Sequence, residues 1–157
     1  MHTLILGLGN PILSDDVVGI LVADGVEAAL AQQAPRADVT VATASLGGLA
    51  LMERMLGYER VILIDALWRT NEVPGVLLRL GLEDLALPAT TERSVSPHDT
   101  SLGIALALGR QLDLPLPAEI IIYAITVQSI LEVSSEPSPA VAAAVPHAVA
   151  AVLTELE

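Results

Sequence analysis

Three side chains far apart in the sequence have the types and positions expected of a metal-binding or catalytic site: Asp16, Asp65 and His98. Asp16 follows the first apolar segment and Asp65 ends a later one, so both carboxylates are expected at the carboxyl ends of strands. His98 follows Pro97 at the expected start of a helix, where the helix dipole disfavours a protonated imidazole. Two carboxylates and a neutral imidazole form an O,O,N ligand set suited to a borderline divalent ion such as nickel or zinc. Such an ion can polarise a carbonyl group or activate water.

Each of the three residues also has a purely structural interpretation. Asp16 can be a first-turn acidic residue that interacts favourably with a helix dipole, although the neighbouring Asp15 would be sufficient for that role. Asp65 can bond a loop amide, because a buried carboxylate is costly unless it is paired or ligates a cation. His98 can be a solvent-exposed residue in the first turn of a helix. The residue types and their spacing leave these alternatives open.

The elements that must position these residues alternate between strand-like and helix-like segments. We expect strands over residues 3–8, 38–43, 60–65, 75–80 and 119–125, and helices over residues 15–33, 49–56, 96–112 and 140–156. Ser14 or Asp15 is expected to cap the first helix and Ser96 the third. The alternation predicts a single-domain α/β three-layer sandwich over residues 1–157, in which an about five-stranded, mostly parallel twisted sheet carries helices on both faces.

Composition and charge exclude several classes of function. The chain of 157 residues has 19 acidic side chains against seven basic ones and a net charge of −12. It should repel nucleic acids and anionic membranes, so neither is an expected partner. The absence of cysteine excludes disulfides and thiolate metal sites. No apolar run reaches membrane-spanning length and the N-terminus lacks the basic segment of a signal peptide, so we expect a cytoplasmic protein.

The turn after the first strand, LGLGNPILSDDVVG over residues 6–19, combines glycines with two adjacent carboxylates. A glycine-rich strand-to-helix turn usually binds phosphate through backbone N–H groups, but the aspartates would repel a phosphate. The dinucleotide motif G-x-G-x-x-G fails at its third glycine, and Pro11 removes an N–H donor. The string GLGNP also resembles the opening of bacterial peptidyl-tRNA hydrolases. That family continues with its catalytic histidine, whereas this chain has no histidine between His2 and His98, so we reject both interpretations.

The whole run instead resembles the N-terminal signature of the [NiFe]-hydrogenase maturation proteases, which is a strand, G-x-G-N, a short apolar stretch and D-[DE]-x-x-G. The residues that match it in order are Gly7, Gly9, Asn10, Asp15, Asp16 and Gly19. The family's second signature, an aspartate that ends an apolar strand, resembles ILIDA over residues 62–66. Its third, S-P-H, resembles residues 96–98. Towards the C-terminus, Glu132 and SPAV over residues 138–141 resemble the family's closing glutamate and S/T-P-x-V segment.

The resemblance implies an endopeptidase that removes the C-terminal extension of a [NiFe]-hydrogenase large-subunit precursor after nickel insertion. Asp16, Asp65 and His98 match the family's metal-binding positions, which implies that they contact the metal and act in catalysis, with a carboxylate assisting the attack of water. The nickel is implied to arrive with the precursor, and zinc or cadmium to substitute for it. Gly7 and Gly9 would then admit the precursor's tail and its nickel, while Asp15 caps or braces the turn.

Two segments depart from the family pattern. Many members carry D-G-G-T-x-G after the second strand, whereas residues 43–48 read TASLGG and contain no aspartate. An Ile-Pro step that is common after the last strand is missing around residues 126–128. The altered loop motivates a second hypothesis, in which the protein is a nickel-site chaperone or checkpoint protein that binds the precursor without cleaving it.

Overall fold

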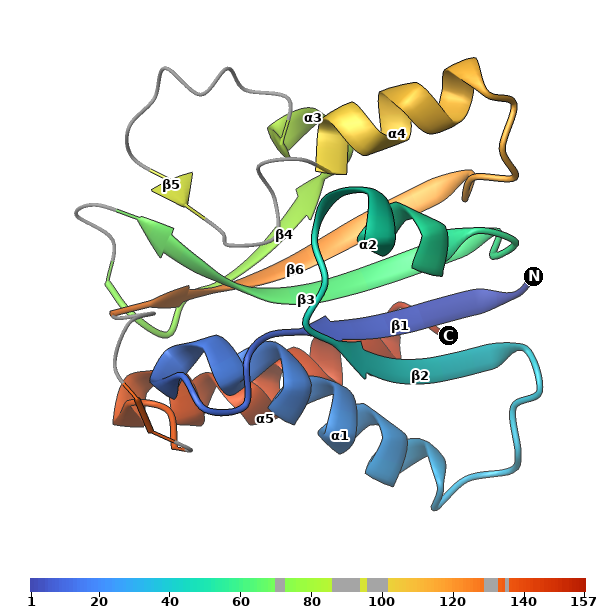
Figure 1. Ribbon diagram of the computed structural model, residues 1–157. Helices are drawn as coiled ribbons and strands as arrows, with labels where there is room; N and C mark the ends of the chain where they lie inside the picture. The colour runs from blue at the N-terminus through green and yellow to red at the C-terminus, as the bar shows by residue number, and fades with distance from the viewer. Residues whose placement is uncertain (70–72, 86–93, 96–101, 129–132, 135) are drawn as a thin grey trace.

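A mixed sheet with helices on both faces forms the body of the protein (Figure 1). The computed structural model describes residues 1–69, 73–85, 94–95, 102–128, 133–134 and 136–157. In these residues the strands are β1 (Thr3–Leu8), β2 (Val39–Ala44), β3 (Arg60–Arg69), β4 (Leu77–Gly81), β5 (Ser94–Val95) and β6 (Glu119–Val127). The helices are the 3-10 helix η1 (Ser14–Val17), α1 (Val18–Leu30), α2 (Gly48–Met55), α3 (Leu82–Leu85), α4 (Leu102–Gln111) and α5 (Pro139–Thr154). The predicted single-domain α/β sandwich is confirmed.

The strand order explains why the central strands are continuous apolar runs. The order is β2-β1-β3-β6-β4, and β5 pairs with β3 off this path. The pairs β1–β2, β1–β3 and β3–β6 are parallel, whereas β4 is an antiparallel edge strand beside β6. A parallel strand with helices on both sides of the sheet has no solvent-facing side, so β1 is buried at every position.

The predicted end of the third strand and the predicted start of the first helix are wrong in ways that affect the site. The strand expected to end at Asp65 continues to Arg69, because β6 runs beside it and pairs Trp68 with Val127, while β5 adds a short partner at the same residues. The first helix begins as the 3-10 helix η1, and neither Ser14 nor Asp15 caps it: neither η1 nor α1 has a side-chain cap hydrogen bond. The predicted cap at Ser96 lies outside the described residues.

The core has two layers because successive residues of a buried strand point to opposite faces of the sheet. Ile62 and Ile64 of β3 belong to the layer beneath α1 and α5, whereas Leu63 belongs to the layer beneath α2 and α4. With phenylalanine absent, branched aliphatic side chains and alanine make up most of both layers, together with Met52, Met55 and Tyr123. Among the helices that the structure describes, none has both the length and the apolar character needed to cross a bilayer.

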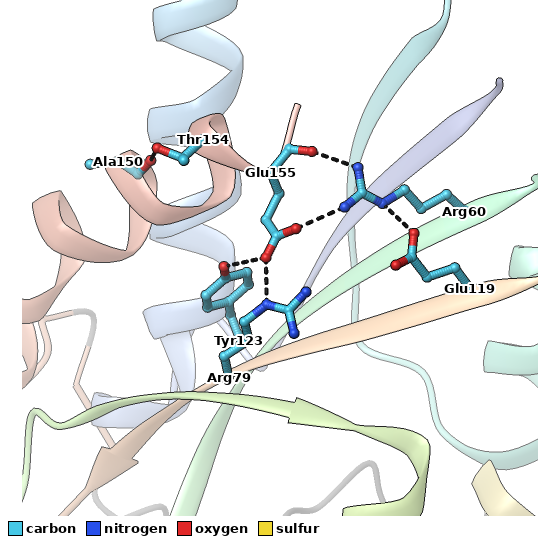
Figure 2. A network of polar contacts seen from close by, with 7 residues as sticks. All are labelled: Arg60, Arg79, Glu119, Tyr123, Ala150, Thr154 and Glu155. Atoms are coloured by element: carbon cyan, nitrogen blue, oxygen red, sulfur yellow. Dashed lines mark hydrogen bonds and ion pairs between the residues drawn. The ribbon is translucent and has the colours of Figure 1, made fainter. Parts of the chain in front are cut away.

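A polar network ties the end of the last helix to the strands β3, β4 and β6 (Figure 2). The Glu155 carboxylate accepts hydrogen bonds from Arg79 Nε at 2.5 Å and Tyr123 Oη at 2.8 Å, and pairs with Arg60 Nη2 at 2.8 Å. Arg60 Nε pairs in turn with Glu119 at 2.8 Å. The hydrogen bond from Arg79 lowers the pKa of Glu155, and burial, followed by the bond to Glu155, raises the pKa of Tyr123. The network fastens α5 to β3, β4 and β6.

The lowered pKa of Glu155 gives a pH-dependent contribution to stability. Because its folded pKa lies below its unfolded value, the contribution is present above about pH 4.5 and is lost as the pH falls through the folded pKa. We expect Glu155→Gln to destabilise the protein at pH 7, and the difference from the wild type to shrink between pH 5 and pH 3. Urea unfolding at several pH values measures it. Glu157→Gln, two residues away, is the control, and an equal pH dependence in both variants would contradict the assignment.

Candidate functional site

The sheet has a topological switch point between β1 and β3. The helix α1, which connects β1 to β2, packs with α5 on one face, whereas α4, which precedes β6 beside β3, packs with α2 on the opposite face (Figure 1). The chain therefore leaves β1 towards β2 over one face of the sheet and enters β6, on the far side of β3, from the other face. In open α/β sheets, the carboxyl ends of the strands at such a point form the crevice in which ligands bind. Asp16 and Asp65 both lie here.

Asp16 is placed by a tight turn that directly follows β1. The chain leaves β1 at Gly9 and turns over Asn10, whose carbonyl oxygen accepts a hydrogen bond from Leu13 N at 3.2 Å, while Asn10 Oδ1 accepts one from Ile12 N at 3.2 Å. Asp16 Oδ2 closes the arrangement by accepting a hydrogen bond from Asn10 N at 2.9 Å. Asp16 is 2% exposed. Its carboxylate is therefore held in one orientation by the same turn that carries it to the crevice.

Asp15 has a different structural role from Asp16. It is buried and accepts hydrogen bonds from Ser138 N at 2.6 Å, from Ser138 Oγ at 3.1 Å and from Gln128 N at 3.1 Å. Ser138 is the residue before α5, so the carboxylate also lies at the amino end of that helix, where the dipole favours negative charge. The prediction that Asp15 braces the turn is confirmed, although its partners lie more than a hundred residues away. This contact joins the SPAV segment to the N-terminal turn.

Asp65 lies inside β3, one residue beyond its last pairing with β1. That last pair joins Gly7 to Ile64, whereas β6 continues alongside and pairs Asp65 with Ala124. Asp65 is 3% exposed, and its Oδ1 accepts a hydrogen bond from Ala66 N at 2.8 Å. Leu63 belongs to the layer beneath α2 and α4, and the two-residue period of a strand puts Asp65 on the same face. A carboxylate on a central strand at the switch point is thus fixed by rigid backbone.

Close packing brings the segment that carries Asp16 against β3. The helix η1 contacts β3, and a Cβ on Gly19 would collide with the carbonyl oxygens of Leu8 and Ile64. The expectation that Gly7 and Gly9 open the crevice to a substrate is wrong. A Cβ on Gly7 would meet the Gly19 carbonyl and the Ala23 side chain, and one on Gly9 would meet the Asp16 carbonyl. The glycines of this motif let the helix approach the strands, which places Asp16 next to the strand of Asp65.

The loop that departs from the family pattern lies beside the same turn. Gly9 N donates a hydrogen bond to Ala44 O, the last residue of β2, at 3.1 Å. The chain then passes through residues 45–47 into α2, whose N-cap Gly47 makes no side-chain cap hydrogen bond. Residues 43–48 therefore border the crevice without contributing a carboxylate to it.

The third predicted ligand, His98, and the closing Glu132 lie outside the described residues. The helix α4 is described from Leu102, four residues after His98 in the sequence, and it leads into β6, which is parallel to β3. Among the described residues, no three histidine, aspartate or glutamate side chains gather into a group that could hold a metal ion. The structure thus brings Asp16 and Asp65 to one crevice, and the assignment of His98 stays a prediction.

Sequence reasoning missed two residues that organise this region, Asn10 and Ser138. Asn10 was included only as part of a motif, yet its backbone N–H orients Asp16 and its side chain shapes the turn. Ser138 precedes a proline at the first position of a helix, which is a recognisable start signal. No local pattern connects Ser138 with Asp15, so that contact becomes visible only in the folded chain.

Comparison with known proteins agrees with this geometry. A model of the family described as hydrogenase maturation protease matches residues 24–155. The hydrogenase 2 maturation protease of Escherichia coli K12 is 28% identical over 108 residues, which are 68% of this chain and 62% of the relative's length. The chain thus spans less than two thirds of that relative.

Solved structures cover more of the chain. The hydrogenase maturating endopeptidase HybD from Escherichia coli superimposes with a TM-score of 0.79 and 27% identity over 99% of this chain and 92% of that one. The [NiFe] hydrogenase maturation protease HybD from Thermococcus kodakarensis has the same fold, with a TM-score of 0.71 and 24% identity over the full length of both chains. The family model, which matches most of the sequence, together with these likenesses shows that this chain belongs to the hydrogenase maturation protease family.

Proposed function

We propose that this protein is an endopeptidase that removes the C-terminal extension of a [NiFe]-hydrogenase large-subunit precursor after nickel has been inserted. The observation that carries the proposal is the pair of buried carboxylates, Asp16 and Asp65, held on rigid elements at the switch point of the sheet. Membership of the hydrogenase maturation protease family supports the reaction class and the kind of substrate. The substrate would be a protein.

The nickel in this proposal belongs to the substrate. Asp16, Asp65 and His98 would contact the nickel of the precursor, and zinc or cadmium could take its place. The chemistry of the two described residues fits this role, because hydrogen bonds from Asn10 N and Ala66 N orient the two carboxylates. Such orienting bonds are usual for side chains that ligate a metal. A neutral imidazole at His98 would add the nitrogen ligand that a borderline ion accepts.

Recognition of the nickel would hold the scissile peptide beside the protease. A carboxylate at the switch point would take a proton from water as the water oxygen attacks the peptide carbonyl carbon. The C–N bond then breaks, the proton passes to the leaving amine, and the extension departs as a free peptide. The gain from such positioning is large, since fixing reactants in a near-attack arrangement supplies several kcal/mol of the barrier reduction, about 7 or more in favourable cases.

The test compares nickel-loaded and nickel-free precursor encoded in the same genome. We expect the purified protein to shorten only the nickel-loaded form. Asp65→Asn and His98→Ala should each slow the reaction by about 100-fold or more, the usual size of a lost positioning or acid–base group. Equal cleavage of both precursor forms would remove nickel recognition from the proposal. Full activity in both variants would remove the three-residue site.

A second function is favoured by the loop at residues 43–48, which borders the crevice and lacks the aspartate found in many family members. In this alternative the protein is a checkpoint that binds the nickel-loaded precursor and does not cut it. Stable capture of the nickel-loaded precursor with no loss of its C-terminal mass would support this function over proteolysis. Restoring the aspartate by Thr43→Asp, the position that aligns with the family's aspartate, and then observing cleavage would point to the loop as the cause.

A further inference from the structure

The loops around the crevice share one property that the proposed chemistry does not use. Among the described residues, each loop or helix start that follows a parallel strand presents a large aliphatic side chain that is more than half exposed. After β1 it is Ile12 at 60%, after β2 Leu49 at 52%, after β3 Val73 at 71% and after β6 Val133 at 77%. We call these four residues the apolar ring. Single exposed aliphatic residues are ordinary, but one on every strand exit at the same edge is a patterned surface.

The structure holds the ring residues in place. Ile12 sits in the turn that Asn10 shapes, and the same Asn10 donates its N–H to Asp16. Leu13 forms an isolated antiparallel bridge with Val133, and Ser134 N donates to Ile12 O at 3.0 Å, so these two strand exits are joined. Val73 is fixed by its carbonyl oxygen, which accepts a hydrogen bond from the buried Thr126 Oγ1 at 2.7 Å. A partner that binds an already ordered backbone loses less entropy than one that must first order the loops.

The net charge of the chain bears on the kind of partner. Charged residues of both signs are described at this edge, because Glu136 is exposed and β3 ends at Arg69, while Asp15, Asp16 and Asp65 are buried. The whole chain carries a net charge of −12. A second copy of this chain would bring like charges together, which disfavours self-association through this edge. A partner protein with an apolar contact surface and neutral or basic surroundings would be complementary.

We propose that the apolar ring is the docking surface for the folded body of the precursor, which seats the substrate over Asp16 and Asp65. This inference rests on the proposed function and adds the partner's contact chemistry to it. The ring residues follow β2, β1, β3 and β6, which are neighbours along the edge that carries Asp16 and Asp65, so a protein seated on them would cover this edge and present its tail there. The ring would then govern binding of the precursor and leave the chemical step to the buried carboxylates.

The experiment measures binding and cleavage separately. The probe is the nickel-loaded large-subunit precursor encoded in the same genome. Its binding is measured by interferometry with Asp16→Asn protein, which is not expected to cleave it. Its cleavage is measured with protein in which Asp16 is intact. The test variants are Ile12→Ser and Val133→Ser, each made in the Asp16→Asn protein and in the protein with Asp16 intact. Each should weaken binding by about 10-fold, as the loss of a central apolar contact does. KM should rise and kcat should change little. Leu112→Ser is the matched control, because Leu112 is also 60% exposed and follows α4 outside the ring.

Each outcome decides between the ring and the proposed function. If the precursor is cleaved and both ring variants bind it as the wild type does, the ring is not the docking surface, and the proposed function stands. If the protein binds through the ring and does not cleave, the docking surface stands and the checkpoint function replaces proteolysis. If the wild type neither binds nor cleaves the precursor, both ideas fail. A wild-type dimer that Ile12→Ser dissociates in sedimentation would assign the ring to self-association and overturn the inference.

Discussion

Replacing Asp16 by asparagine is expected to reduce precursor processing by about 100-fold or more while leaving the fold intact. The amide oxygen of asparagine can still accept the hydrogen bond from Asn10 N, so the turn keeps its shape. The negative charge that would contact the metal is lost, however. We expect the free energy of unfolding to change by less than about 1 kcal/mol, because a buried charge is removed without leaving a cavity. Initial cleavage rates and urea unfolding of the same preparation measure the two effects.

Asp15 provides the contrast within the same dipeptide. Asp15→Ala removes the acceptor of three hydrogen bonds from Ser138 and Gln128, which should cost about 3 kcal/mol of stability. Processing at a temperature where the variant is folded should persist at a reduced rate. If Asp15→Ala lost activity as completely as Asp16→Asn while remaining folded, the assignment of a structural role to Asp15 and a functional role to Asp16 would be wrong.

Gly19→Ala should be among the most destabilising single substitutions in the chain, at about 3 kcal/mol, with a fall in Tm of about 10 °C. The added methyl group would collide with the carbonyl oxygens of Leu8 and Ile64, and neither belongs to a flexible side chain that can move aside. Relief requires α1 to move away from β1 and β3, which displaces Asp16 from the switch point. Thermal unfolding and processing rate should therefore decline together.

Gly103→Ala is the matched control for Gly19→Ala. Gly103 also lies in the first turn of a helix, but a Cβ there would meet nothing within 4 Å. Alanine has the higher helix propensity, so this variant should be neutral or more stable by up to about 1 kcal/mol. A similar loss of stability in both variants would show that helix backbone effects, and not the close approach to β3, determine the result at Gly19.

The sequence allowed the strands and their order of appearance to be predicted because their apolar runs are short and end at glycine, proline or polar residues. Residues 3–8 were predicted with the bounds that β1 has. The end of β3 could not be predicted, since Asp65 looks like a terminator and only the neighbouring β6 keeps the strand extended to Arg69. The local sequence of a strand carries no information about the neighbouring strand. It therefore cannot show how far pairing with that neighbour extends the strand.

The residue types of the candidate site could be predicted from the sequence, but the residues that hold them in place could be predicted only in part. Asp16 and Asp65 were expected at strand ends, and both are buried at the switch point. The capping role expected of Ser14 and Asp15 was wrong. The Asp15 carboxylate instead accepts a hydrogen bond from Ser138 N, 123 residues later in the sequence. The roles of Gly7 and Gly9 were also misjudged, since glycine serves equally for an open approach and for close packing, and only the position of the helix α1 distinguishes them. His98 stays a prediction.

The most direct measurement of the central claim is the intact mass of a nickel-loaded [NiFe]-hydrogenase large-subunit precursor before and after incubation with this protein. A family member of verified activity on the same precursor serves as the positive control. We predict loss of the C-terminal extension at one peptide bond with the wild-type protein and an unchanged mass with Asp16→Asn. An unchanged mass with the wild type, under conditions in which the positive control trims the precursor, would contradict the assignment of this chain as a processing endopeptidase.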